Sequence, residues 1–124
     1  MKKIFVVFLI VTAASAFGQT TANEWFERGN EYLNSGDFRN AITAYSEAIN
    51  RGSTNLDAYW FRGLSHSMIG NYDAGITDFN IVINGAPNFP GVYMQRGFAY
   101  GAMGMYHKTI ADYRTGLERG FDPT

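Results

Sequence analysis

The feature that most constrains the fold of this chain is an internal repeat with a period of 34 residues. When residues 22–55, 56–89 and 90–123 are aligned, four columns hold the same residue in every copy, and three further columns hold aromatic residues. The identical columns are Arg28, Arg62 and Arg96; Gly29, Gly63 and Gly97; Gly36, Gly70 and Gly104; and Ile42, Ile76 and Ile110. A period of this length predicts a stack of similar units rather than one compact core, because such units bury their apolar faces against one another.

Within each copy, apolar residues recur with the spacing of a helix, and a turn interrupts them. In the first copy, one stripe runs from Trp25 to Leu33, and a second begins at Phe38. Gly36 lies between the two stripes, where glycine can end a helix in the left-handed conformation. The sequence therefore predicts an all-α fold, a short α-solenoid of three helix-turn-helix repeats with the bounds given above.

A second glycine column lies inside the first helix of each repeat, directly after the recurring arginine. Glycine in a helix interior costs about 1 kcal/mol relative to alanine. Its recurrence predicts that the paired helix approaches closely there. The structural glycines expected from this argument are Gly29, Gly63 and Gly97.

The recurring arginines need acidic partners if they are buried, since an unpaired buried charge is very costly. One column of the second helix holds an aspartate in the second and third copies, but Ala44 in the first. Pairing within a repeat leaves only Arg28 without an acid, whereas pairing across neighbours would leave more groups unpaired. The expected structural pairs are Arg62 with Asp78 and Arg96 with Asp112.

These columns resemble the tetratricopeptide repeat. The residues that carry the resemblance are Trp25-x2-Arg28-Gly29-x2-Tyr32, Ala41-x3-Tyr45, and Pro87 at the end of the second copy. The resemblance covers residues 22–123, with departures such as His66 in place of the usual tyrosine. Members of this family are scaffolds that bind peptides or protein surfaces and are not catalysts. The resemblance implies the same kind of function here, with an unidentified protein or peptide as partner.

The resemblance also implies a binding surface, because the first helices of such repeats line a concave groove. The residues mapped to that groove are Phe26, Asn30, Leu33, Trp60, Phe61, Leu64, Met68, Met94, Gln95 and Phe98. An exposed face this apolar is typical of an interaction surface. The charges mapped to it, Glu27 and Asp57, are negative, and the basic positions of the family's carboxylate-binding members are not basic here. We expect an apolar or aromatic ligand, with basic residues favoured over an acidic tail. The alternative is that Trp60 and Phe61 pack between neighbouring repeats.

The N-terminus has the pattern of a secretory signal peptide. Two lysines precede an apolar run over residues 4–11, and small residues follow over 12–16. Cleavage after Ala16 or after Gly18 satisfies the small-residue rule, and we assign residues 1–18 to the signal. The alternative is an uncleaved anchor, but the apolar segment is shorter than the ~20 residues that span a bilayer. We therefore expect export to a bacterial periplasm or beyond, with no stable membrane span after cleavage.

Composition argues against other classes of function. Lys and Arg number 10 against 11 Asp and Glu, which offers little material for a phosphate-binding face, so we expect no nucleic-acid partner. The chain has no cysteine and lacks the common metal-binding and nucleotide-binding motifs, so we expect no metal, cofactor or catalytic residue. A structural or surface role is favoured for both histidines, His66 and His107.

The end of the third repeat is a second candidate surface. Stacked repeats usually need a polar cap, and the sequence after this repeat contains no capping helix. Gly97, Gly101 and Gly104, together with Ala102, Met103 and Met105, would let another helix come close, which predicts self-association. A structural unit that docks or assembles through this end is therefore the alternative to the groove-binding scaffold. Short arrays that tolerate a bare end, and a truncated array, are further interpretations.

Overall fold

The structure is a computed structural model that describes residues 20–124. The predicted signal peptide lies outside the described residues. Six helices follow one another along the described chain. They are α2 (Ala22–Asn34), α3 (Phe38–Asn50), α4 (Leu56–Met68), α5 (Tyr72–Gly85), α6 (Pro90–Ala102) and α7 (Tyr106–Glu118).

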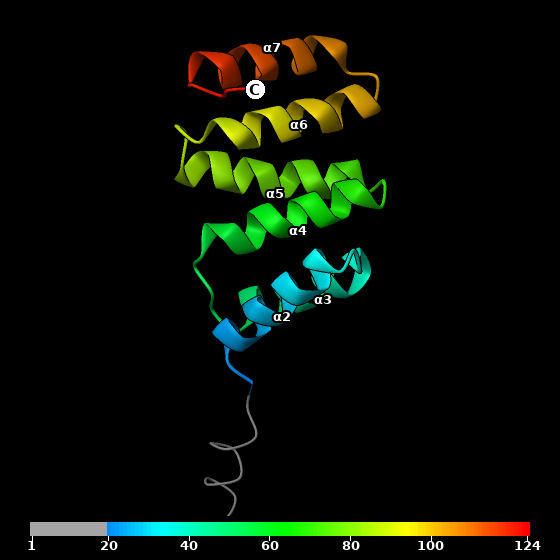
Figure 1. Cartoon of the computed structure of the whole chain (residues 1–124), viewed down its shortest axis with the longest axis vertical. Coiled ribbons are helices and arrows are strands. Elements are labelled where there is room, and N and C mark those ends of the chain that lie inside the picture. Colours follow the sequence, from blue (N-terminus) through cyan, green and yellow to red (C-terminus); the bar gives the residue numbers. More distant parts are fainter. Residues whose placement is uncertain (1–19) are drawn as a thin grey trace, which may run out of the picture.

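The helices form three hairpins stacked along the long axis of the molecule (Figure 1). Helix α2 packs on α3, α4 on α5, and α6 on α7, while α3 with α4 and α5 with α6 join neighbouring hairpins. The α2–α3 hairpin lies at one end of the stack, and α7 lies at the other. This arrangement confirms the predicted all-α fold of three helix-turn-helix pairs.

The glycine column between the paired helices has the backbone conformation that the sequence predicts. Gly36, Gly70 and Gly104 have φ angles of 78°, 82° and 76°. Gly36 and the residue after it close the end of α2, because the Gly36 N–H donates to Leu33 O (3.1 Å) and the Asp37 N–H donates to Tyr32 O (2.9 Å). These bonds satisfy carbonyls that a helix end would otherwise leave without partners.

The glycines inside the first helices face aromatic rings from the second helices. A Cβ atom built on Gly63 would lie 2.8 Å from the Phe79 ring, and one on Gly97 would lie 2.8 Å from the Tyr113 ring. Gly29 meets the Tyr45 ring in the same way. The close approach of the paired helices therefore follows from the pairing of a glycine column with an aromatic column.

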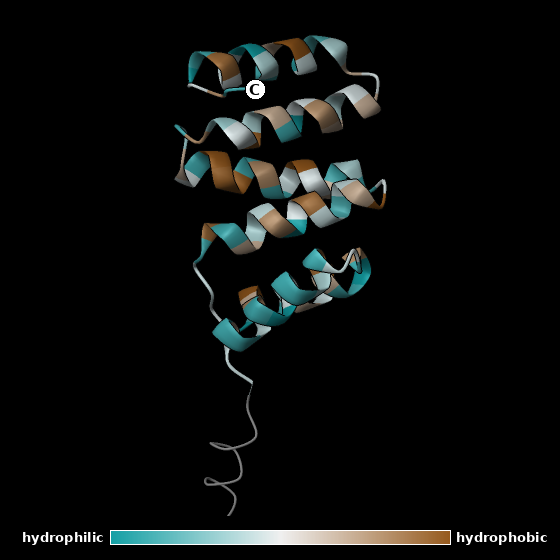
Figure 2. Cartoon of the chain, in the orientation of Figure 1, coloured by the Kyte–Doolittle hydropathy of each residue, from teal (hydrophilic) through white to brown (hydrophobic). Residues whose placement is uncertain are grey.

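The hydrophobic core lies where the second and third hairpins meet. Phe79 and Val82 of α5 form a buried cluster with Val92 of α6, and Trp60 and Leu64 of α4 pack against this cluster. The first hairpin adds buried Ala and Tyr side chains on α3. The two end helices, α2 and α7, are mainly hydrophilic, with hydrophobic residues interspersed along α7 (Figure 2).

Candidate protein-interaction face

Two arginine–aspartate pairs tie the first and second helices of the second and third hairpins together. Arg62 donates to Asp78 through Nε (2.9 Å) and Nη2 (2.8 Å). Arg96 donates to Asp112 in the same way, at 2.9 and 2.7 Å. Hydrogen bonding to its aspartate raises the pKa of each arginine, while burial acts in the opposite direction. Both arginines therefore stay charged and are positioned by the fold, as the pairing argument expects.

All the residues mapped to the groove lie on the first helices. Phe26, Asn30 and Leu33 lie on α2; Trp60, Phe61, Leu64 and Met68 lie on α4; and Met94, Gln95 and Phe98 lie on α6. We call this set the first-helix face. Eight of its ten members are partly buried, and the other two are exposed.

Aromatic side chains join the three hairpins along this face. The Trp60 ring stacks on Phe61 at 4.8 Å, and Phe61 stacks on Phe26 at 6.3 Å. Trp60 also meets Phe89 edge-on at 4.7 Å, and its indole N–H donates to Gln95 Oε1. The alternative considered for Trp60 and Phe61 therefore holds in part, because both rings pack between repeats while keeping some exposure.

Phe89 is a contributor to this face that the sequence reasoning missed. It precedes Pro90 at the start of α6, outside the first helices from which the groove was mapped. A signal was available, because a residue before proline favours an extended conformation and an aromatic residue at a helix start can pack back on a neighbour.

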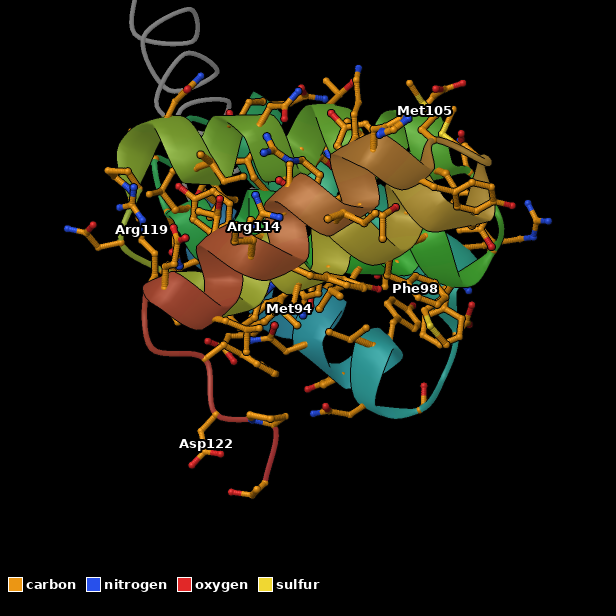
Figure 3. All side chains as sticks on the ribbon, turned by 90° about the horizontal axis from the view of Figure 1, so that it is seen from above. Met94, Phe98, Met105, Arg114, Arg119 and Asp122 are labelled. Carbon is orange, nitrogen blue, oxygen red and sulfur yellow. The ribbon has the colours of Figure 1, made fainter. Side chains whose placement is uncertain are left out.

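Met68 and Phe98 are the members of the face that remain open to solvent, with 63% and 59% of their surface exposed. Seen from above, Met94 and Phe98 lie on the same side of α6 (Figure 3). An exposed methionine and an exposed phenylalanine on helices that also carry partly buried aromatic residues provide apolar contacts for a ligand.

The charges near the face are negative. Burial, followed by the charge of Glu27, raises the pKa of Tyr45, whose hydroxyl donates to Asn30 Oδ1 (2.8 Å). Glu27 and Asp57 are exposed. Helices α2, α4 and α6 contain no lysine, and two of their three arginines are held by aspartates. The third, Arg28, lies over the Trp25 ring at 4.9 Å.

The histidines take no part in this face. His66 is half-buried, its Nδ1 has no partner within the described residues, and burial lowers its pKa. Among residues 20–124 there is no group of three His, Cys, Asp or Glu side chains placed to hold a metal ion. Over the same residues, none of the helices combines the length and apolar character needed to cross a membrane.

The end of the third repeat is apolar, in part through a residue that was expected and in part through residues of α7. Gly97 is buried against Tyr113, so it offers no surface to another helix. Met103 is exposed as expected (39%), and the more exposed apolar residues lie on α7. They are Tyr106 (67% exposed), Ile110 (55%) and Leu117 (55%).

Comparison with known proteins supports the repeat architecture. The family model for the tetratricopeptide repeat matches residues 22–55, the span that the internal period assigns to the first repeat. No curated protein sequence is significantly similar to the chain.

Solved structures match over most of the chain. A crystal structure of MamA superposes with a TM-score of 0.75 and 26% identity, covering 81% of this chain and 58% of that one. The chain therefore spans little more than half the length of this relative. The first TPR of Spaghetti (RPAP3), bound to an HSP90 peptide, gives 0.75 with 22% identity, covering 81% of this chain and 79% of that one.

A third structure extends the likeness to another TPR domain. The Sgt2 TPR domain from Aspergillus fumigatus gives a TM-score of 0.71 with 19% identity, covering 79% of this chain and 65% of that one. Together with the family match, these structures place the three helix pairs in one known architecture. The chain thus has the fold of a tetratricopeptide-repeat protein, and its first repeat is recognised in the sequence as well.

Proposed function

We propose that the protein is a non-catalytic scaffold that binds a protein or peptide segment on its first-helix face. The observation that carries this proposal is the exposure of Met68 on α4 and Phe98 on α6, on the first-helix face that also holds the Trp60–Phe61–Phe26 stack. The tetratricopeptide-repeat fold supports the general function, since a similar structure holds an HSP90 peptide.

The ligand on this face is an apolar or aromatic segment that also carries positive charge. The peptide bound to Spaghetti has the sequence SRMEEVD, which is rich in acids. On the present chain the exposed charges beside the face are Glu27 and Asp57, which would repel such a peptide. The same charges would favour a segment with lysine or arginine next to its apolar side chains.

Substitutions at the two exposed residues test the proposal. Met68→Ser/Phe98→Ser should remove binding and preserve the fold, because neither side chain belongs to the buried core. Two synthetic peptides serve as probes, one alternating phenylalanine with lysine and one alternating phenylalanine with glutamate. We expect the lysine peptide to bind the unmodified protein and to lose about tenfold or more in affinity for the variant.

The matched control is Ile81→Ser, which removes an exposed apolar residue from α5, away from the first-helix face. Circular dichroism verifies that all variants fold. Equal binding to both peptides would disprove the predicted charge preference. Unchanged binding of the lysine peptide to the double variant would disprove the assignment of the face itself.

We also infer that the protein acts in the periplasm or outside the cell, after loss of residues 1–18 or 1–16. The sequence pattern of these residues supports this inference. N-terminal sequencing of protein from the cell envelope tests it. A mature N-terminus at Phe17 or Gln19 is the expected result, whereas an intact Met1 on a membrane-bound chain would favour the uncleaved anchor.

A further inference from the structure

The outward stripe of α7 is the counterpart of surfaces that are covered elsewhere in the molecule. In the first two hairpins, the second helix packs against the first helix of the next hairpin. Three apolar columns of the second helices differ in burial along the array: Phe38, Ile42 and Ile49 on α3; Tyr72, Ile76 and Ile83 on α5; and Tyr106, Ile110 and Leu117 on α7. The α3 and α5 residues are partly buried, but the α7 residues are exposed. Helix α7 therefore presents a helix-binding face without a helix on it among the described residues.

A charge distinguishes this face from the other two. Arg62 donates through Nη1 to Ser46 of the preceding hairpin (3.2 Å), and Arg96 donates to Asn80 in the same way (2.8 Å). The α7 residue in the column of Ser46 and Asn80 is Arg114, which lies on α7 at the open end (Figure 3). This column therefore holds a hydrogen-bond acceptor on α3 and α5 but a cation on α7. No carboxylate forms an ion pair with Arg114 within residues 20–124.

Helix α2 of a second copy does not fit this face in the register of the array. The covering helices bury small or apolar residues on either side of their arginine, namely Ala58 and Ser65 on α4, and Val92 and Ala99 on α6. The α2 residues in these columns are Glu24 and Glu31, and its arginine is Arg28. Stacking a second copy would bury two carboxylates against the apolar stripe and place Arg28 against Arg114, and both effects oppose association.

We propose that the α7 face binds an amphipathic helix of another protein that carries an aspartate or glutamate opposite Arg114. The partner helix has small or apolar residues four positions before and three positions after its acid, as Val92 and Ala99 flank Arg96 in α6. Charge complementarity with Arg114 and continuity with the α3–α4 and α5–α6 interfaces support this choice. The face lies on α7, so the inference is independent of the ligand proposed for the first-helix face.

A peptide with the α6 sequence provides the probe, because α6 packs on α5 and the apolar stripe of α5 resembles that of α7. The α5 stripe begins with tyrosine and isoleucine, and so does the α7 stripe. Two forms of residues 90–102 are compared, one with the native sequence and one with Arg96→Glu, each kept helical by a staple on its outward side. Fluorescence anisotropy measures their binding to the whole protein. We expect the glutamate peptide to bind about tenfold or more tightly than the native peptide.

Reversing the charge of the protein gives the decisive comparison. With Arg114→Glu, the native arginine peptide should become the tighter ligand. Ile110→Asp should abolish binding of both peptides, whereas Phe98→Asp should leave it unchanged, because Phe98 lies on α6 and belongs to the first-helix face. Both substituted residues are exposed, and circular dichroism verifies that the variants fold.

Three outcomes would overturn the proposal. One is equal binding of the two peptides, or binding of neither, to the unmodified protein. Another is a preference that survives Arg114→Glu unchanged. The third is a dimer of the unmodified protein in sedimentation experiments that Ile110→Asp dissociates, since the occupant of the face would then be a second copy.

Discussion

At the scale of single residues, the Arg62–Asp78 pair stabilises the second hairpin because each partner is partly or fully removed from water. Their side chains are 21% and 3% exposed. Asp78→Ala should lower the free energy of unfolding by about 2–4 kcal/mol, since it leaves the guanidinium without its carboxylate. Urea denaturation measured by circular dichroism gives this value.

Arg28 supplies the matched control for that prediction. It is exposed and rests on the Trp25 ring, and its own repeat has Ala44 in the column that holds the aspartates in the other two. Arg28→Leu should therefore change stability by no more than about 0.5–1 kcal/mol. If Asp78→Ala and Arg28→Leu lowered the free energy of unfolding by similar amounts, burial would not determine how much the Arg62–Asp78 pair stabilises the protein.

Glycine substitutions probe the close approach of paired helices. Gly63→Ala should destabilise the protein by about 1–2 kcal/mol, because its methyl group would meet the buried Phe79 ring at 2.8 Å. Gly91→Ala, also in a helix, meets its nearest side chain only at 3.7 Å and should stabilise by up to about 1 kcal/mol. Thermal unfolding of the two variants should therefore shift in opposite directions, and a gain in both would argue against tight ring packing.

His66 makes the stability of the protein dependent on pH. Burial lowers its pKa from the ordinary 6.5, although Asp78 acts in the opposite sense. As the pH falls, His66 therefore becomes protonated in the unfolded chain at a higher pH than in the folded chain. The stability contributed by neutral His66 is complete above pH 6.5 and is lost as the pH falls toward the lowered pKa. His66→Tyr copies Tyr100 of the third repeat and should weaken this acid-side loss.

The measurement is the melting temperature of both proteins at about pH 7.5 and about pH 5.5. We expect the unmodified protein to lose more stability between these values than His66→Tyr does. The same loss in both proteins would assign the pH dependence to other groups.

At the scale of helices, the repeat columns predicted much of what the structure contains. Identical glycines marked the turns at Gly36, Gly70 and Gly104, because a left-handed residue there has few alternatives. The pairing of Arg62 with Asp78 followed from the cost of an unpaired charge. These features depend on contacts within one hairpin, so the sequence of one repeat carries enough information to predict them.

Features that depend on contacts between hairpins were harder to predict. Trp60 stacks on Phe61, and it also contacts Phe89 and Gln95, which belong to the following repeat unit or the loop before it. The partial burial of Trp60 and Phe61 depends on the rotation of one hairpin relative to the next, which the sequence period does not determine. For the same reason, the sequence pointed to the end of the third repeat and to Met103, which is exposed, but it also named the buried Gly97 and missed Ile110 on α7.

This interdependence gives a prediction at the scale of neighbouring helices. Trp60→Ala should destabilise the protein by about 3 kcal/mol, because Trp60 packs against the core cluster as well as against Phe89. Met68→Ala, on the same helix but exposed, should cost less than about 1 kcal/mol. Urea titrations measure the free energy of unfolding of both variants and so compare the two losses. A small loss for Trp60→Ala would mean that its ring is available to ligands rather than to the core.

At the scale of the whole molecule, the two ends of the stack differ in how they meet solvent. The outer side of α2 carries Glu24, Arg28 and Glu31, whereas α7 exposes an apolar stripe. Within a linear array, stability comes from each repeat and from its interfaces with neighbours. Helix α7 has an interface on one side only within the described residues, and its two buried residues are Asp112 and Gly116.

Hydrogen exchange should separate the middle of the stack from its ends. Amides of α4 and α5, which pack around the buried Phe79, should exchange slowest, and those of the end helices α2 and α7 should exchange fastest among the helices described. The α6 peptide with Arg96→Glu should then slow exchange in α7 while leaving α2 unchanged, because a bound helix supplies the interface that α7 lacks. Mass spectrometry of the exchanged protein reads each helix separately. Uniform protection without the peptide would indicate a single cooperative unit, and protection gained at α2 instead would place the peptide at the opposite end of the array.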